Sequence, residues 1–169
     1  ENMMMGYKAK EHTLETFTLS YDNPDFMKRV AVFCDVCDQV LAKDILNWSY
    51  KTSQEGYRER LEIRIGKRFI KLIKCEGKFD ERQSLFGWID MSNGDVLMGH
   101  SYKSPSASEK RNPRSNIWND HFGVDCVSTY GVGYKGSKYD NSEFIAKAVD
   151  NQGYGNTIKE TITNQWRLI

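Results

Sequence analysis

The 169-residue sequence has no strong excess of charge, no long apolar run and no evident catalytic pattern. Its formal net charge is +1, so the chain is not a polycation, and any nucleic-acid binding must come from a local patch. No apolar run approaches the roughly 18 residues that a membrane-spanning helix needs, and residues 1–6 are too short for the apolar part of a signal peptide. Four cysteines without a secretory signal lead us to expect reduced thiols in a cytoplasm.

The composition fits one globular domain at 1–169, with 1–12 expected to be frayed. Hydrophobic residues make up 39% of the chain and charged residues 28%, as in domains that bury a sizeable core. Alternating apolar and polar residues predict a strand at 14–21. Asn23-Pro24 provides an N-cap followed by proline, which predicts a helix at about 24–47. Its apolar positions recur at spacings of three and four: Phe26, Val30, Phe33, Cys34, Cys37, Leu41, Ile45 and Trp48.

The middle of the chain predicts a four-stranded antiparallel meander. Residues 61–65 alternate, Gly66-Lys67 suits a type II′ turn, and 68–75 form the return strand. Asn93-Gly94 then joins strands 84–91 and 96–100, because this dipeptide favours tight hairpins.

Beyond the meander we predict a loop at 103–119, a short fifth strand at 125–130 and a helix at 142–150. A capping box at 140–143 is expected to open that helix, whereas 157–169 fit either a helix or a strand. Together the elements predict an α+β fold, in which one long N-terminal helix packs on a four- to five-stranded antiparallel sheet and a short C-terminal helix follows.

Two cysteines form a CxxC motif, Cys34 and Cys37, within the predicted helix. They lie on its apolar stripe, where free cysteine behaves as a small hydrophobic residue. A zinc site with Cys75 and Cys126, or a redox motif, is the alternative. We favour core thiols, because the zinc pairing is split along the chain and the motif is far from a helix N-terminus.

The sequence offers weak signals for other chemistry. Residues 131–136 match GxGxxG, but no helix follows at once and no βαβ pattern exists, so a turn or bulged strand fits better than dinucleotide binding. His100, Lys103 and His121 would suit a phosphodiesterase, although solvated histidines are common in loops. Asp90 and Asp95 flank the turn and are expected to bond local backbone donors. We therefore expect no enzyme activity, no metal and no cofactor.

Basic residues gather on the predicted return strand and in the loop that follows the second hairpin. If they converge, they form a patch that meets phosphates or an acidic protein surface, and nearby rings would stack on bases. The alternative is a solvated face balanced by acidic residues. The full basic set is Lys67, Arg68, Lys71, Lys74, Lys103, Lys110, Arg111 and Arg114.

Segment 68–117 resembles a group of small uncharacterised phage proteins. The likeness rests on 68–73, on the aromatic-rich hairpin at 86–90 and 94–97, on 101–105 and on 114–117. That group carries GDVL in the hairpin, then SWKAP and RGNI. Tyr102 and Ser115 stand where the group has Trp and Gly. The resemblance implies a viral or mobile-element origin, with host cytoplasm as the location, and selects Lys103, Arg114 and Asn116 for testing.

We therefore expect a small phage-type accessory protein that binds stoichiometrically to a host or viral nucleoprotein. Its concrete form is an inhibitor of a host defence complex such as a CRISPR effector. The alternatives are a DNA- or RNA-binding protein of viral replication and a small phosphodiesterase. The predicted binding residues are Lys71, Tyr102, Lys103, Lys110, Arg111, Arg114, Asn116, Tyr130 and Tyr134.

Overall fold

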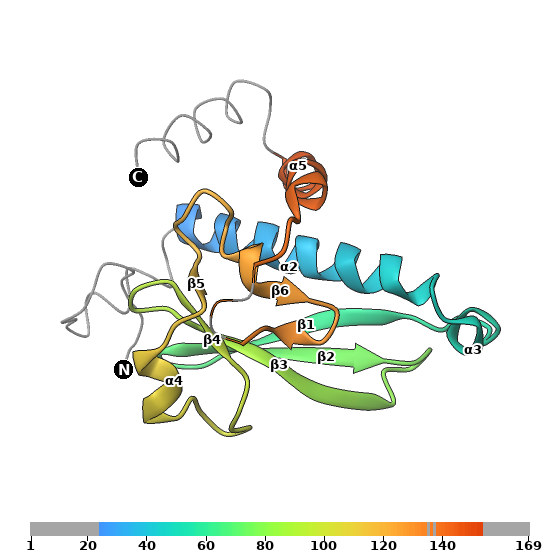
Figure 1. Ribbon diagram of the computed structural model, residues 1–169, viewed down its shortest axis with the longest axis horizontal. Coiled ribbons are helices and arrows are strands. Elements are labelled where there is room, and N and C mark those ends of the chain that lie inside the picture. Colours follow the sequence, from blue (N-terminus) through green and yellow to red (C-terminus); the bar gives the residue numbers. More distant parts are fainter. Residues whose placement is uncertain (1–23, 135, 137, 154–169) are drawn as a thin grey trace.

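The computed structural model describes residues 24–134, 136 and 138–153. A long helix, α2 (Pro24–Ile45), lies across one face of a five-stranded antiparallel sheet, and α5 (Ser142–Asn151) lies beyond that helix (Figure 1). The α+β prediction, with its long helix, its sheet and its short C-terminal helix, is confirmed. The predicted strand at 14–21, the frayed start and the ambiguous segment 157–169 lie outside the described residues, and the single-domain assignment stays a prediction.

The sheet follows chain order, β1-β2-β3-β4-β5. Its strands are β1 (Glu59–Ile65), β2 (Phe69–Glu76), β3 (Arg82–Asp90), β4 (Asp95–Met98) and β5 (Ser115–Asn116). The remaining elements are short: helices α3 (Ser49–Thr52) and α4 (Ala107–Arg111), the 3-10 turn η1 (Val124–Cys126), and a separate hairpin of β6 (Val127–Ser128) and β7 (Gly131–Val132). The meander and the Asn93-Gly94 turn are therefore confirmed.

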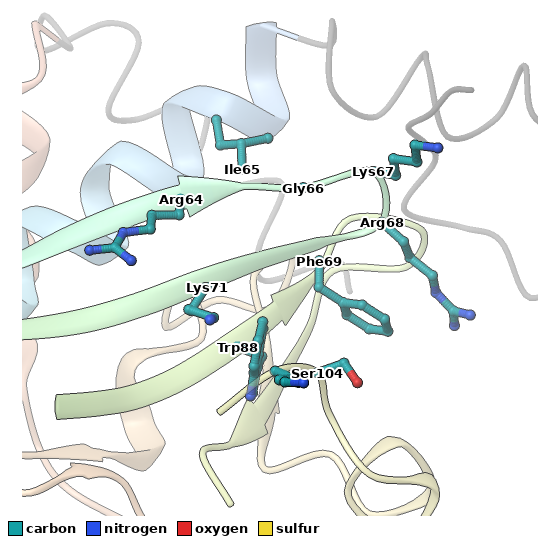
Figure 2. A pocket seen from close by; sticks show the side chains of 10 residues that line it. Arg64, Ile65, Gly66, Lys67, Arg68, Phe69, Lys71, Trp88 and Ser104 are labelled. Carbon is teal, nitrogen blue, oxygen red and sulfur yellow. The ribbon is translucent and has the colours of Figure 1, made fainter. Parts of the chain in front are cut away.

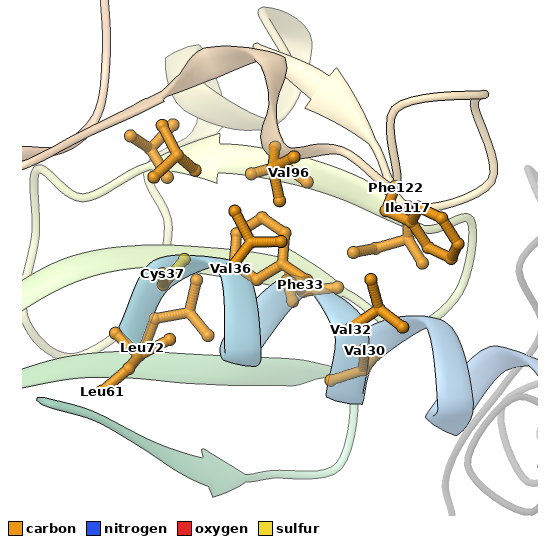
Figure 3. Packing of buried hydrophobic residues seen from close by; sticks show 14 of the residues in the cluster. Val30, Val32, Phe33, Val36, Cys37, Leu61, Leu72, Val96, Ile117 and Phe122 are labelled. Atoms are coloured by element: carbon orange, nitrogen blue, oxygen red, sulfur yellow. The ribbon is translucent and has the colours of Figure 1, made fainter. Parts of the chain in front are cut away.

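The core lies between α2 and the sheet (Figure 3). Phe33 and Val36 of α2 and Leu72 of β2 are fully buried in it, and each such side chain contributes about 1.5–3 kcal/mol by leaving water. The apolar stripe predicted for the helix is confirmed over most of its length. It ends early, because α2 stops at Ile45 and Trp48 is 41% exposed beside α3.

The first hairpin turn differs from the prediction. A type II′ turn needs a positive φ at Gly66, but the φ of Gly66 is not positive. Instead the Gly66 N–H donates to the Phe69 carbonyl at 2.9 Å, so Lys67 and Arg68 form the turn. The type II′ prediction is wrong, and the observed turn places two basic side chains at the tip of the hairpin.

The segment after β4 also differs from the prediction. The predicted loop at 103–119 contains α4 and β5, and β5 is the fifth strand of the main sheet. The strand predicted at 125–130 is replaced by η1 and β6, which pairs only with β7. Two-residue strands are too short to show alternation, so the sequence carried no signal for β5.

The start of α5 has no capping box. Asn141 donates its side-chain amide to the carbonyls of Val124 (2.8 Å) and Val127 (3.2 Å) instead of capping the helix. Asp140 accepts from the Ser142 N–H at 3.1 Å and from its hydroxyl at 2.7 Å. Asn141 therefore ties α5 to η1 and β6.

Candidate anion-binding groove

Alternation along β2 gives the sheet two different faces. Ile70 and Leu72 are buried in the cluster under α2, so Lys71 between them points to the opposite face. Register places Lys71 opposite Arg64 of β1 and Trp88 of β3. These three residues consequently share the face that α2 leaves uncovered, which we call the helix-free face.

A groove of about 440 Å³ lies on the helix-free face, next to the turn between β1 and β2 (Figure 2). The side chains around it are mainly cationic or aromatic. They come from three strands, from the β1–β2 turn and from the loop after β4. We call this feature the basic groove and define it by Arg64, Lys67, Arg68, Phe69, Lys71, Trp88, Lys103 and Ser104.

Aromatic rings fix the position of one lysine of the basic groove. The Lys71 Nζ lies 3.9 Å from the centroid of the Tyr102 ring and 5.3 Å from that of Trp88. Phe69 meets Trp88 edge to face, with centroids 6.3 Å apart. An ammonium group over aromatic faces is attracted to them, so these rings hold Lys71 in the groove.

The cations of the basic groove divide into paired and available ones. Arg68 forms a forked pair with Asp90, with N–O distances of 3.2 and 2.9 Å. Within the described ranges, no carboxylate lies within ion-pairing distance of Lys67, Lys71 or Lys103. The groove can therefore offer three ammonium groups to an anionic partner.

Trp88 is 3% exposed. Its indole N–H is buried, and no acceptor among the described atoms receives it. Buried donors in folded proteins nearly always have a partner. A residue that lines the basic groove therefore holds a buried donor without an acceptor in the described part of the chain.

Two residues selected for testing have internal structural contacts. The side chain of Arg114 is 8% exposed, pairs with Glu109 at 3.2 Å, and donates to the Gly133 carbonyl at 3.1 Å. Asn116 donates to the Asn93 carbonyl (3.0 Å) and to Asp95 (2.9 Å). Both residues tie β5 and its neighbours to adjacent turns, so their substitution would disturb folding.

The other predicted binding residues are spread over the surface. Lys110 and Arg111 are exposed on α4 and do not line the basic groove. Tyr130 and Tyr134 are 86% and 74% exposed, and Tyr130 borders a separate depression near the end of α2. The structure brings Lys71, Tyr102 and Lys103 together and places these four elsewhere.

Several residues of the basic groove were missed from the sequence. Arg64, Phe69, Trp88 and Ser104 line it but were not predicted as binding residues. Strand alternation held a signal for Arg64 and Trp88, because cross-strand register sets them beside Lys71. Lys74, by contrast, points to the helix side, where its Nζ lies 3.5 Å from Glu59.

The cysteines are packed as the helix pattern predicted. Cys37 is fully buried, and Cys34 packs against the same cluster. Burial raises the pKa of the Cys34 thiol to about 12, and it does the same for Cys126. Thiols with such pKa values remain protonated near neutral pH. Among the described residues, no group of three or more Cys, His, Asp or Glu side chains is placed to hold a metal ion.

The histidines and the glycine-rich motif form no common site in the described ranges. His100 and His121 are both exposed, and His121 lies 3.5 Å from Asp120, its neighbour in sequence. Gly131 and Val132 form β7, and the next helix begins only at Ser142. Asp90 accepts from Ser92 at 2.9 and 2.6 Å, so it fixes the turn, as expected for an aspartate there.

The chain belongs to a protein family described as a family of unknown function (DUF7717), which matches residues 10–136. No curated protein matches the chain, and no solved structure matches it. Within the described residues, each helix is too short or too polar to cross a bilayer.

Proposed function

We propose that this DUF7717 protein is a binding module that acts stoichiometrically on a host or viral nucleoprotein through its basic groove. The observation that carries the proposal is the convergence of Lys67, Lys71 and Lys103 around aromatic walls. Ammonium groups without carboxylate partners are suited to phosphates or to an acidic protein surface. Rings at the same place supply the anchors that dominate binding energy at many interfaces.

The concrete form of the proposal is an inhibitor of a host defence complex such as a CRISPR effector. The resemblance of segment 68–117 to small phage proteins supports it, because most of the basic groove is built from that segment. A protein that occupies a nucleic-acid groove of such a complex needs no chemistry of its own. Its effect would depend on affinity and shape alone.

Direct binding to DNA or RNA in viral replication is the second candidate. The rings of Phe69 and Tyr102 beside lysines favour it, since aromatic side chains stack on exposed bases. The net charge of +1 weighs against tight binding to free nucleic acid, because counterion release scales with the phosphates that are neutralised.

Charge reversal tests the proposed function. We expect Lys71→Glu with Lys103→Glu to weaken capture of the nucleoprotein by about tenfold or more, because repulsion replaces attraction at each phosphate or carboxylate. The matched control is Lys110→Glu with Arg111→Glu, which changes the net charge equally outside the groove. The measurement is co-purification with candidate effectors, followed by a titration at increasing salt.

Two results of that titration would decide between the candidates. Retention on the partner protein at salt concentrations that abolish the shift of free oligonucleotide supports the nucleoprotein module, whereas capture that falls with salt as steeply as the oligonucleotide shift supports direct binding. Unchanged capture in the groove variant would show that the proposed function is wrong.

A further inference from the structure

The indole N–H of Trp88 is the feature of the basic groove that most narrowly specifies a ligand. A donor that is buried and has no acceptor is unfavourable in a protein interior, and Trp88 is almost fully buried. In Figure 2 the indole lies between Lys71 and the loop that carries Ser104. An acceptor placed in the groove would satisfy the donor.

The surroundings of the indole select an anionic acceptor. Lys71 lies 5.3 Å from the centre of the Trp88 ring, and Lys103 lines the same groove. An oxygen that accepts from the indole would therefore carry, or lie next to, negative charge. Charge-assisted hydrogen bonds are shorter and stronger than neutral ones.

We infer that the basic groove binds a phosphate of a single-stranded nucleic acid, with Trp88 donating to a phosphate oxygen and Tyr102 stacking on the adjoining base. This inference rests on the proposed function and names the nucleic acid as the part of the nucleoprotein that the groove contacts. The groove holds about 440 Å³, room that a carboxylate alone would leave unfilled. Tyr102 is 49% exposed although Lys71 lies over its ring, so ring surface is left for a base.

An acidic peptide is the competing ligand. Its carboxylates would also suit the lysines, but they would leave the ring surface unused. A nucleotide uses the indole donor, the ammonium groups and a ring together, as binding sites for single strands do. The response of the Trp88 indole proton can therefore distinguish a nucleotide from an acidic peptide.

The experiment follows the indole ¹H–¹⁵N signal of Trp88 in the full chain by NMR. The probes are hexathymidylate, thymidine monophosphate, thymidine, inorganic phosphate and hexaglutamate. Trp88→Phe identifies the signal and removes the donor together with part of the ring, and Trp48→Phe, which makes the same change of side chain outside the groove, is the matched control. The Trp48 indole already donates to Asp44 at 3.1 Å, so its signal should not respond.

We expect hexathymidylate and thymidine monophosphate to move the Trp88 signal downfield, whereas thymidine should have no effect on it. It also expects Trp88→Phe to weaken hexathymidylate binding by about tenfold, as for loss of a hydrogen bond to a charged group, while Trp48→Phe leaves it unchanged. If Trp88→Phe does not fold, the titration of the unmodified chain decides, with the signal assigned from its proximity to Leu97 and Lys71 protons.

Three outcomes would overturn the inference. A response to hexaglutamate but not to the nucleotides would assign the groove to acidic peptides. An equal response to inorganic phosphate and to hexathymidylate would leave a phosphate site without a base subsite. No response to any probe, with capture of the nucleoprotein still lost in the Lys71 and Lys103 variant, would remove the inference and retain the proposed function.

Discussion

The two faces of the sheet carry different kinds of side chain although they are built from the same strands. Under α2, the side chains of β1 and β2 are apolar, as at Leu61 and Leu72, or form buried ion pairs, as Glu59 does with Lys51. On the helix-free face, alternate residues such as Arg64 and Lys71 have basic side chains that reach solvent. A substitution should thus change stability on one face and binding on the other.

Phe33 and Phe69, one on each side of the sheet, should give the largest difference in unfolding free energy. Phe33 is fully buried under α2, so Phe33→Ala should lower the free energy of unfolding by about 3–5 kcal/mol through lost burial and a cavity. Phe69 is half-buried on the other face, and Phe69→Ala should cost about 1 kcal/mol. Urea denaturation of both variants measures the difference. Similar losses would show that the helix-free face also holds the fold together.

A second contrast uses two glutamates of β1. Glu59 has a fully buried side chain, 2.7 Å from the Lys51 ammonium and 2.6 Å from the Tyr57 hydroxyl. Burial by itself raises the pKa of Glu59, but the hydrogen bonds from Lys51 and Tyr57 outweigh it, so the pKa lies below the ordinary 4.5. The charged form is therefore the one that stabilises the folded state above pH 4.5, and this contribution is lost as the pH falls through the lowered pKa.

Glu59→Gln should accordingly cost about 3 kcal/mol at neutral pH, because it leaves Lys51 without its charged partner. The gap between this variant and the unmodified chain should narrow as the pH falls below 4.5, the ordinary value for the side chain. Glu62→Gln, whose ion pairs on the helix-free face are about one-third exposed, should cost about 0–1 kcal/mol. Thermal unfolding from pH 3 to pH 7 tests this, and a gap that stays constant with pH would contradict it.

The smallest contrast is between Arg114 and Lys103. Arg114→Ala removes a buried ion pair and a bond to the Gly133 carbonyl, so it should destabilise the chain by about 2 kcal/mol. Lys103→Ala, at an exposed position, should change stability by less than about 0.5 kcal/mol. Denaturant midpoints check both values. Should Arg114→Ala leave the midpoint unchanged, the ion pair to Glu109 would have no role in folding.

The sequence predicted the parts of the fold that have a periodic or characteristic residue pattern. The stripe of α2 and the Asn93-Gly94 turn carry periodic or dipeptide signals, and both were confirmed. By contrast, β5 and α4 are too short for a period to appear. The type II′ prediction failed because Gly66 lies before the turn and not within it.

The candidate site was only partly predictable for a related reason. Lys71, Tyr102 and Lys103 were selected by residue type, and the structure places Lys71 and Lys103 at one groove, with the Tyr102 ring against Lys71. Arg114 and Asn116 were also selected, but their side chains bond within the chain, Arg114 to Glu109 and the Gly133 carbonyl. Trp88 was not selected, since its free donor is visible only once its neighbours are known.

One irregularity sets which side of the sheet the indole occupies. Leu72 pairs with Gly87 whereas Ile73 pairs with Leu85, so Phe86 is an additional residue in β3. Such an insertion lets Leu85 and Trp88, three residues apart, lie on the same side of the sheet. The position of the indole therefore depends on the number of residues in β3. Deleting Phe86 would turn the side chain of either Leu85 or Trp88 to the opposite face of the sheet. The loss of a single residue would therefore remove either the indole or a packing side chain from the helix-free face.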